Sequence, residues 1–262
     1  MPSEAPQGRV LLVGAGPGPV DLLTVRALRA IEGAEALLYD ALVSDEVLAL
    51  APRGCTRIQT GKRAGGASMA QETINHLMLR LARRGLRVVR LKGGDPSVFG
   101  RSGEEVEFLR AHGVGAEVIP GVTAACAAAA QFAFPLTHRG LARRVVFATA
   151  RVSDGAVIDT GWDRLADREA TLALYMARDS IGPVFQRLIE EGRSPTTPAA
   201  AVENAGGAQA RLLTGTLATL PAQLRTAALR GPVVVVVGEV AARACAASLA
   251  PEGQARAAGV GG

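Results

Sequence analysis

The stretch Val10-Leu11-Leu12-Val13-Gly14-Ala15-Gly16-Pro17-Gly18 begins as an aliphatic run and ends in glycines and prolines. A short apolar run of this kind is typical of a strand that is buried on both faces, as in a parallel sheet. The glycines and prolines predict a stiff, shaped loop at the end of that strand. Because open α/β sheets bind their ligands at this edge, the loop is better explained as a binding-site wall than as a purely structural turn.

A nicotinamide or flavin dinucleotide site is the obvious alternative, since Asp40 ends the next predicted strand. A G-x-G-x-x-G fingerprint that begins at Gly14 needs glycine at position 19, where this chain has Pro19. Pro17 and Pro19 also lack the N–H groups that would bind a pyrophosphate. The sequence therefore argues against a dinucleotide enzyme.

Between residues 9 and 120, short apolar runs alternate with amphipathic patterns, which predicts a parallel sheet covered by helices. The predicted strands here are Val10–Val13, Ala36–Tyr39, Arg57–Gln59, Val88–Leu91 and Glu117–Ile119, and the predicted helices are Val25–Glu32, with Thr24 as N-cap, Met69–Arg84 and Gly103–His112. After an alanine-rich segment, a second α/β domain is predicted from strands Arg144–Thr149, Thr171–Met176, Ala199–Val202, Arg211–Thr216 and Val233–Val237, and helices Gly182–Glu191 and Leu217–Leu229. We expect domains over residues 9–121 and 122–246, and a disordered tail over 247–262.

Composition excludes several classes of function. The 262 residues are 48% hydrophobic but only 3% aromatic, which predicts an aliphatic core. The net charge is +5, but the basic residues are scattered without interleaved aromatics, so we expect no nucleic-acid partner. No apolar run is long enough to span a bilayer, and residues 1–8 do not read as a secretory signal, so we expect a cytoplasmic protein. The three cysteines lie far apart without a histidine cluster, which predicts buried or inert thiols and no metal site.

Seven blocks in order resemble the uroporphyrinogen-III C-methyltransferases of the tetrapyrrole methylase family. They are Val13–Gly18 followed by Asp21–Thr24, then Tyr39–Val43, Gly61–Arg63, Val89–Pro96, Phe99–Arg101, Pro120–Ala124 and Pro135–Arg139. The resemblance covers about residues 9 to 245 and continues through Leu174–Met176, Ala201–Asn204 and Gly231–Val240. It implies two α/β domains of the class III methyltransferase type with the cofactor cleft between them, usually as a homodimer.

The resemblance also implies a cofactor, S-adenosyl-L-methionine, which leaves as S-adenosyl-L-homocysteine. The residues that it implies as cofactor contacts are Pro17, Gly93, Gly94, Asp95, Val98, Thr123, Ala124, Met176 and Ala205. Two of them also have a physical reason, because Gly93 and Gly94 allow a ligand to approach the backbone closely. The family usually has Glu-Asn-Gly where this chain has Glu203-Asn204-Ala205-Gly206.

Asp40 and Lys62 match the pair that is often assigned as proton acceptor and proton donor in the family. Methylation of a pyrrolic carbon ends with the loss of a proton, so a base and an acid beside the ring make chemical sense. Asp40 could instead orient a loop, and Lys62 could bind a substrate carboxylate. Arg101 is a competing candidate for the base, by resemblance to the Phe-Gly-Arg block.

The implied substrate, uroporphyrinogen III, carries eight carboxylates, which arginine forks bind well. Arg101 and Arg139 are the candidate carboxylate ligands, with Glu104 placed to orient Arg101. The chain departs from the family at Ala41, where arginine is common, and at Arg151, where the family has the histidine of Thr-Gly-His. Arg151 could bind a carboxylate in its place.

The resemblance implies transfer of two methyl groups to C2 and C7 of uroporphyrinogen III, giving precorrin-2 for sirohaem or cobalamin biosynthesis. One alternative is a methyltransferase for a later corrin intermediate. Another is a non-catalytic tetrapyrrole-binding module, which would bind a porphyrinogen yet release no S-adenosylhomocysteine.

Overall fold

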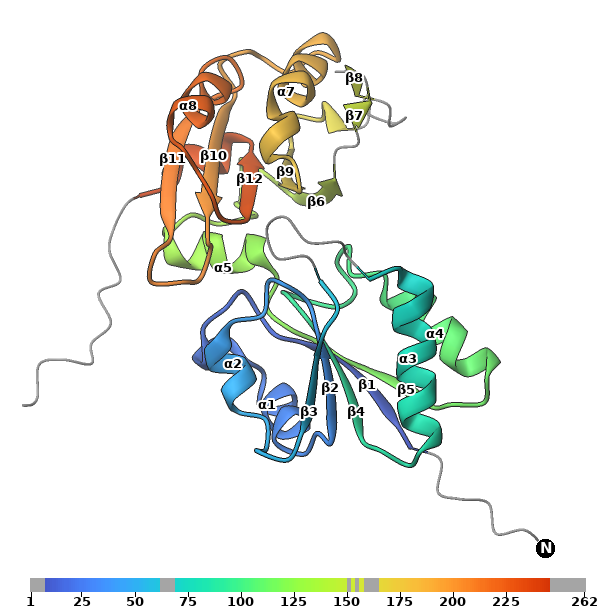
Figure 1. Cartoon of the computed structure of the whole chain (residues 1–262). Helices are drawn as coiled ribbons and strands as arrows, with labels where there is room; N and C mark the ends of the chain where they lie inside the picture. The colour runs from blue at the N-terminus through green and yellow to red at the C-terminus, as the bar shows by residue number, and fades with distance from the viewer. Residues whose placement is uncertain (1–7, 62–68, 150–151, 154–155, 158–164, 246–262) are drawn as a thin grey trace, which may run out of the picture.

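The computed structural model describes residues 8–61, 69–149, 152–153, 156–157 and 165–245. They form two lobes, each built on a five-stranded sheet, with one helix between the lobes (Figure 1). Both lobes combine strands with helices, so the predicted α/β class is confirmed.

The first sheet is wholly parallel, with strand order β3-β2-β4-β1-β5. Its strands are β1 (Val10–Gly14), β2 (Ala36–Tyr39), β3 (Thr56–Gln59), β4 (Val88–Lys92) and β5 (Ala116–Ile119). Each differs from its predicted range by at most one residue at either end. Because all five run the same way, the loops that follow them meet at one edge of the sheet.

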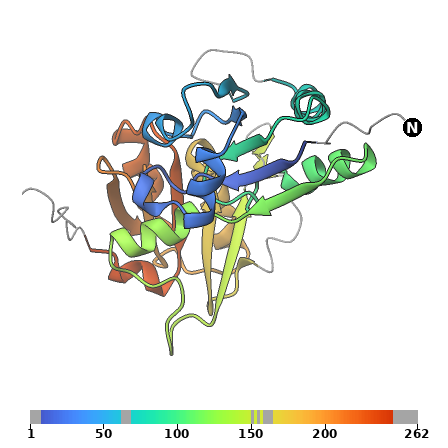
Figure 2. The same ribbon diagram turned by 90° about the horizontal axis from the view of Figure 1, so that it is seen from below.

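Helices cover both faces of this sheet, as Figures 1 and 2 show. The helices are α1 (Val25–Glu32), α2 (Asp45–Ala49), α3 (Gln71–Arg83) and α4 (Ser102–Ala111), with a short 3-10 turn, η1 (Val20–Leu22), before α1. Alternate strand residues face opposite sides: Leu37 packs with α1 and α2, whereas Leu38 packs with α3 and α4. The side chain of Thr24 accepts a hydrogen bond from Ala27 N at 3.1 Å and so caps α1 as predicted. Helix α2 was not predicted, because five residues are too short for a clear helical period.

The second sheet is mixed, with strand order β11-β10-β12-β9-β6. Its strands are β6 (Arg144–Thr149), β9 (Ala170–Tyr175), β10 (Pro198–Glu203), β11 (Arg211–Thr216) and β12 (Val233–Val237), and a separate hairpin pairs β7 (Val152–Ser153) with β8 (Ala156–Val157). Only β6 and β9 pair in parallel. Strand β12 runs against β9 and β10, so it begins at the edge where those two strands end.

The second sheet is also covered on both faces. Helices α7 (Ile181–Glu190) and α8 (Leu220–Thr226) pack on one face, and α5 (Ala124–Gln131) packs on the other with the 3-10 turn η3 (Glu239–Arg243), while η2 (Arg178–Ser180) precedes α7. Val235 contacts the α7 side and Val234 the α5 side, which explains the uninterrupted valine run of β12. The expected domain boundary near residue 121 stays a prediction.

Two expectations from composition can be compared with the structure. Cys55 is buried, whereas Cys126 and Cys245 are exposed, so of the expected buried or inert thiols these two can only be inert, which stays a prediction. In the described part of the chain, no helix has the length and apolarity to cross a bilayer. The predicted tail over 247–262 lies outside the described residues.

Gly121 tests the packing at the loop edge of the first sheet. A Cβ at Gly121 would lie 2.2 Å from the carbonyl oxygen of Gly94 and 2.9 Å from Cα of Gly14, and neither backbone atom can rotate away. We expect Gly121→Ala to lower the free energy of unfolding by about 1–3 kcal/mol, measured by denaturant titration. Gly54→Ala, at a site with nothing within 4 Å, is the matched control and should change it by less than about 0.5 kcal/mol. Equal losses in the two variants would contradict the predicted clash.

Candidate functional site

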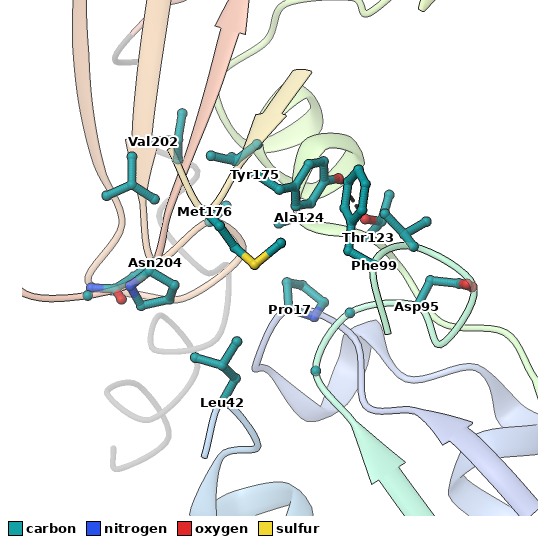
Figure 3. Close-up of a pocket in the computed structure, with 18 of the residues that line it drawn as sticks. Pro17, Leu42, Asp95, Phe99, Thr123, Ala124, Tyr175, Met176, Val202 and Asn204 are labelled. Carbon is teal, nitrogen blue, oxygen red and sulfur yellow. Dashed lines mark hydrogen bonds between the residues drawn. The ribbon is translucent and has the colours of Figure 1, made fainter. Parts of the chain in front are cut away.

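A cavity of about 630 Å³ lies between the two lobes (Figure 3). Its lower wall comes from the loops after β1, β2 and β4, and its upper wall comes from the ends of β9 and β10 and the start of β12. Residues at the N-terminus of α5 line it as well. The cavity therefore depends on both lobes, at the sheet edge where the sequence predicted a binding site.

Two glycine loops are joined at the base of the cavity. Gly94 N donates to Gly16 O at 2.7 Å, and Gly16 N donates to Gly94 O at 3.2 Å. Both residues have left-handed backbone, with φ of +66° at Gly16 and +68° at Gly94, which favours glycine. This mutual pair of hydrogen bonds fixes the loop after β1 against the loop after β4.

Pro17 contacts the opposite lobe. A Cβ at Gly206 would lie 2.6 Å from Cγ of Pro17, so the proline ring sits directly against the backbone that follows β10. The stiff loop predicted from the prolines therefore forms part of the contact between the lobes, as well as lining the cavity.

Asp95 holds the loops of the first lobe together. Its Oδ1 accepts a hydrogen bond from Ser97 N at 2.8 Å, and its Oδ2 accepts one from Gly121 N at 2.9 Å. The carboxylate thus links the loop after β4 to the loop after β5. Asp95 also lines the cavity, so it can shape the wall and contact a ligand.

Tyr175 anchors the N-terminus of α5. Its hydroxyl lies 2.7 Å from Thr123 Oγ1 and accepts a hydrogen bond from Ala125 N at 3.2 Å. Burial raises the pKa of Tyr175, so the phenol remains protonated and can donate to Thr123. The contact is visible in Figure 3 and places Thr123 and Ala124 on the cavity wall.

Apolar side chains are exposed around the cavity. Leu42 is 61% exposed and Met176 is 66% exposed, and both line it (Figure 3). The centroid of the Phe99 ring lies 5.3 Å from that of the Tyr175 ring, and the centroid of the Phe147 ring lies 5.8 Å from it. In a chain with 3% aromatic residues, this grouping offers an apolar surface for a flat ligand.

Three non-glycine residues on the wall have left-handed backbone: Phe99 with φ of 54°, Met176 with 55° and Asn204 with 51°. Such conformations cost about 1–3 kcal/mol each for most residues and are concentrated at binding sites. Their presence on one cavity wall supports a functional role for the cavity.

All nine residues expected to hold a cofactor line this cavity. They are Pro17, Gly93, Gly94, Asp95, Val98, Thr123, Ala124, Met176 and Ala205. They come from five separate stretches of the chain, so the structure brings them together as the resemblance implied.

Asp40 also lines the cavity, at the end of β2. Its side chain is 31% exposed and forms an ion pair with Arg90, and Thr60 Oγ1 donates to it at 3.4 Å. Among the described residues, both partners bind the same carboxylate oxygen, Oδ1. The other oxygen can therefore interact with a ligand.

Arg101 and Arg139 are placed differently from Asp40. Neither is among the residues that line the cavity, although Gly100, next to Arg101, is. Arg101 binds Glu104 through two hydrogen bonds of 2.8 and 2.6 Å, and both side chains are more than half exposed, so the predicted orienting contact is present. Arg139 is exposed in the turn bounded by the His138–Ala142 bridge. Lys62 and Arg151 lie outside the described residues.

The sequence interpretation did not single out three cationic residues on the cavity wall. Lys92 ends β4, Arg178 begins η2, and Arg230 precedes β12. Arg178 is paired with Asp179 through Nε at 2.9 Å. Lys92 directly precedes the two glycines of the Leu-Lys-Gly-Gly-Asp block, and that position was an available signal.

Comparison with known proteins agrees with this site. The model of the tetrapyrrole (corrin/porphyrin) methylases matches residues 9–221. A siroheme synthase from Xylella fastidiosa is 52% identical over 238 residues, which is 90% of this chain and 50% of that protein. A siroheme synthase from Methylococcus capsulatus is 45% identical over 89% of this chain and 49% of its own length. The chain thus spans about half the length of these relatives.

Among solved structures, a uroporphyrin-III C-methyltransferase from Thermus thermophilus in complex with S-adenosyl homocysteine is 41% identical. The match covers 89% of this chain and 98% of the Thermus chain, with a TM-score of 0.75. A cobalt precorrin-4 methyltransferase of cobalamin biosynthesis is 31% identical, covering 88% of this chain and 94% of its own, with a TM-score of 0.78. The fold, the interlobe cavity and these similarities together show that the chain belongs to the tetrapyrrole methylase family.

Proposed function

We propose that this protein transfers methyl groups from S-adenosyl-L-methionine to C2 and C7 of uroporphyrinogen III, giving precorrin-2. The observation that carries the proposal is the interlobe cavity, lined by all nine residues that the family resemblance implies for the cofactor. Support also comes from the 41% identical methyltransferase whose structure holds S-adenosyl homocysteine. On the same resemblance we propose a homodimer, and we also propose that the protein is cytoplasmic.

The cavity suits a ligand of this size and chemistry. Its volume of about 630 Å³ lies in the range of small-molecule sites, which are mostly apolar with a few polar groups. Gly93 and Gly94 leave the backbone accessible, while Leu42 and Met176 offer apolar contact. Bound S-adenosylmethionine would supply a methyl group on a sulfonium, an electrophile that needs no metal for activation.

The protein's part in the reaction is then alignment, exclusion of water and removal of a proton. Aligning a ring carbon with the methyl group accounts for much of the rate, since well-placed reactants have high effective concentrations. After the new carbon–carbon bond forms, the ring system must lose a proton, and Asp40, a carboxylate on the cavity wall, is the proposed acceptor. Lys62 is proposed as its acidic partner on resemblance alone.

The substrate carboxylates need cationic partners outside the cofactor pocket. Arg101, oriented by Glu104, is exposed next to the cavity residue Gly100, and Arg139 and Arg151 are proposed as further ligands from the resemblance. The exposed position of Arg101 and Arg139 is compatible with binding side arms that project from a macrocycle. Arg101 remains the alternative candidate for the base.

A second function is favoured by a specific observation. The cobalt precorrin-4 methyltransferase superposes with a TM-score of 0.78, so a later corrin intermediate is the second candidate substrate. Substrate choice within one fold depends on a few contacts, and methylation assays distinguish the two candidates.

Incubation with substrate tests the proposed reaction. The purified protein, S-adenosylmethionine and enzymatically generated uroporphyrinogen III are combined without oxygen, and the product mass is measured after oxidation. We expect a gain of two methyl groups, with S-adenosylhomocysteine released for each one. Cofactor binding without methylation would favour the later intermediate, and release of no S-adenosylhomocysteine with any tetrapyrrole would favour a binding module.

Two variants separate the candidates for the base. If Asp40 accepts the proton, Asp40→Asn should lower turnover by about 10²- to 10⁴-fold while S-adenosylhomocysteine still binds, measured by calorimetry.

If Arg101 serves only to bind a carboxylate, Arg101→Ala should lose most activity chiefly through a higher KM. Glu46→Gln and Arg110→Ala are exposed controls on α2 and α4 and should leave turnover unchanged. Unchanged turnover in Asp40→Asn would refute its assignment, and a fall confined to kcat in Arg101→Ala would transfer the role to Arg101.

A further inference from the structure

A network of four charged side chains, three of them almost completely buried, lies beside the cavity. Glu105 on α4 is completely buried and accepts hydrogen bonds from Lys92 Nζ, at 3.0 and 3.1 Å, and from Arg90 Nε, at 3.1 Å. The side chains of Arg90 and Lys92 are only 3% and 4% exposed. Arg90 also pairs with Asp40, so the charges alternate along the chain Asp40–Arg90–Glu105–Lys92.

The alternation of β4 explains why these cations are buried. Val89 and Leu91 point to the α1 and α2 side of the sheet, so Arg90 and Lys92 point to the α3 and α4 side. Glu105 lies on α4 opposite both of them, and Gln71 Nε2 from α3 donates to it at 3.1 Å. Buried ion networks rarely stabilise a fold more than apolar residues of similar volume would. The network therefore requires an explanation other than stability.

Both ends of the network reach the cavity. Asp40 and Lys92 are lining residues, and a Cβ on the lining residue Gly100 would lie 3.1 Å from Cε of Lys92. The lysine stem therefore lies directly beneath the loop that joins β4 to α4, residues 93–101. This loop carries four of the nine expected cofactor residues.

The same loop is conformationally strained. Phe99 and Arg101 have φ of 54° and 56°, in the left-handed region that is unfavourable for both residue types. Strain of this kind persists only where surrounding contacts fix the backbone. The Lys92–Glu105 pair joins the residue before the loop to the first turns of the helix after it, so it holds the two ends of the loop together.

We propose that Glu105 is a positioning residue of the transfer site, which through Lys92 fixes the loop 93–101 and through Arg90 fixes the carboxylate of Asp40. The inference rests on the proposed function for its effect on turnover. The predicted effect of Glu105 on the loop 93–101 does not depend on any ligand.

The pH dependence of turnover distinguishes a positioning role of Glu105 from a purely structural one. Burial is the main cause that lowers the pKa of Lys92, and the charge of Arg90 lowers it further, whereas Glu105 and Asp40 oppose both. Within the described part of the chain, these charged groups face Lys92 from β4, α4 and the end of β2, and Glu104 on α4 also interacts with its charge. If the carboxylate of Glu105 is removed, Lys92 should lose its proton at a lower pH, and the alkaline limb of the turnover profile should move to lower pH.

The main test uses the double variant Lys92→Met/Glu105→Gln. The Asp40–Arg90 pair that remains is balanced in charge, so this variant should stay folded where Glu105→Gln alone loses stability. We expect turnover to fall about 10- to 100-fold because the reacting groups are misplaced. We also expect S-adenosylhomocysteine to bind roughly tenfold more weakly by calorimetry, and amide exchange in residues 93–101 to become faster.

Glu107→Gln, an exposed change on the same helix, is the control. Glu105→Asp keeps the charge with a shorter reach, and it should show intermediate losses and a wild-type-like alkaline limb. If every folded variant at Lys92 or Glu105 matches Glu107→Gln in turnover, affinity and exchange, the inference is wrong. If the wild type does not methylate uroporphyrinogen III, the proposed function fails, and amide exchange in residues 93–101 still decides the inference.

Discussion

The close approach of three backbone segments at the carboxyl edge of the first sheet is the constraint on which the cavity depends. The ends of β1, β4 and β5 meet so tightly that a Cβ at Gly14 or Gly121 would overlap a neighbouring backbone atom. Hydrogen bonds between Gly16 and Gly94, and from Gly121 to Asp95, fasten the same segments. Because these loops are fixed to one another, they present a preformed lower wall to the opposite lobe, which lowers the entropic cost of binding a ligand.

Contacts between described residues attach the upper wall to this base. Pro17 packs against Gly206, and the Tyr175 hydroxyl binds Thr123 and Ala125 at the start of α5. These contacts orient the exposed side chains of Met176 and Phe99 around one space. A ligand in that space touches both lobes, so its binding free energy also contributes to holding the lobes together.

Much of the fold could be predicted because the relevant signals are local. Aliphatic runs such as those of β1 and β12 alternate with amphipathic patterns along the chain. This alternation identified nearly every strand to within one residue at each end. The antiparallel pairing in the second sheet could not be predicted, since strand periodicity carries no information on direction. The nine cofactor positions followed from resemblance. Seven of them follow β1, β4 or β5, whose ends meet at one edge of the parallel sheet, whereas Met176 and Ala205 follow β9 and β10 of the second sheet.

The network around Glu105 illustrates what sequence patterns miss. Arg90 and Lys92 in a β-branched strand look like surface charges, and Glu105 looks like an ordinary residue of a helix first turn. Only the packing of α4 on the sheet shows that all three are buried together. Likewise, the sequence identified Arg101 as a site residue with Glu104 beside it, but not that both side chains are more than half exposed.

A crystal structure of the protein with S-adenosylhomocysteine tests the central claim most directly, which is that the interlobe cavity is the cofactor site. We expect the ligand between the lobes, in contact with Gly93–Asp95 from the first lobe and with Met176 and Ala205 from the second. A ligand bound outside this cavity, or held by one lobe alone, would contradict the claim.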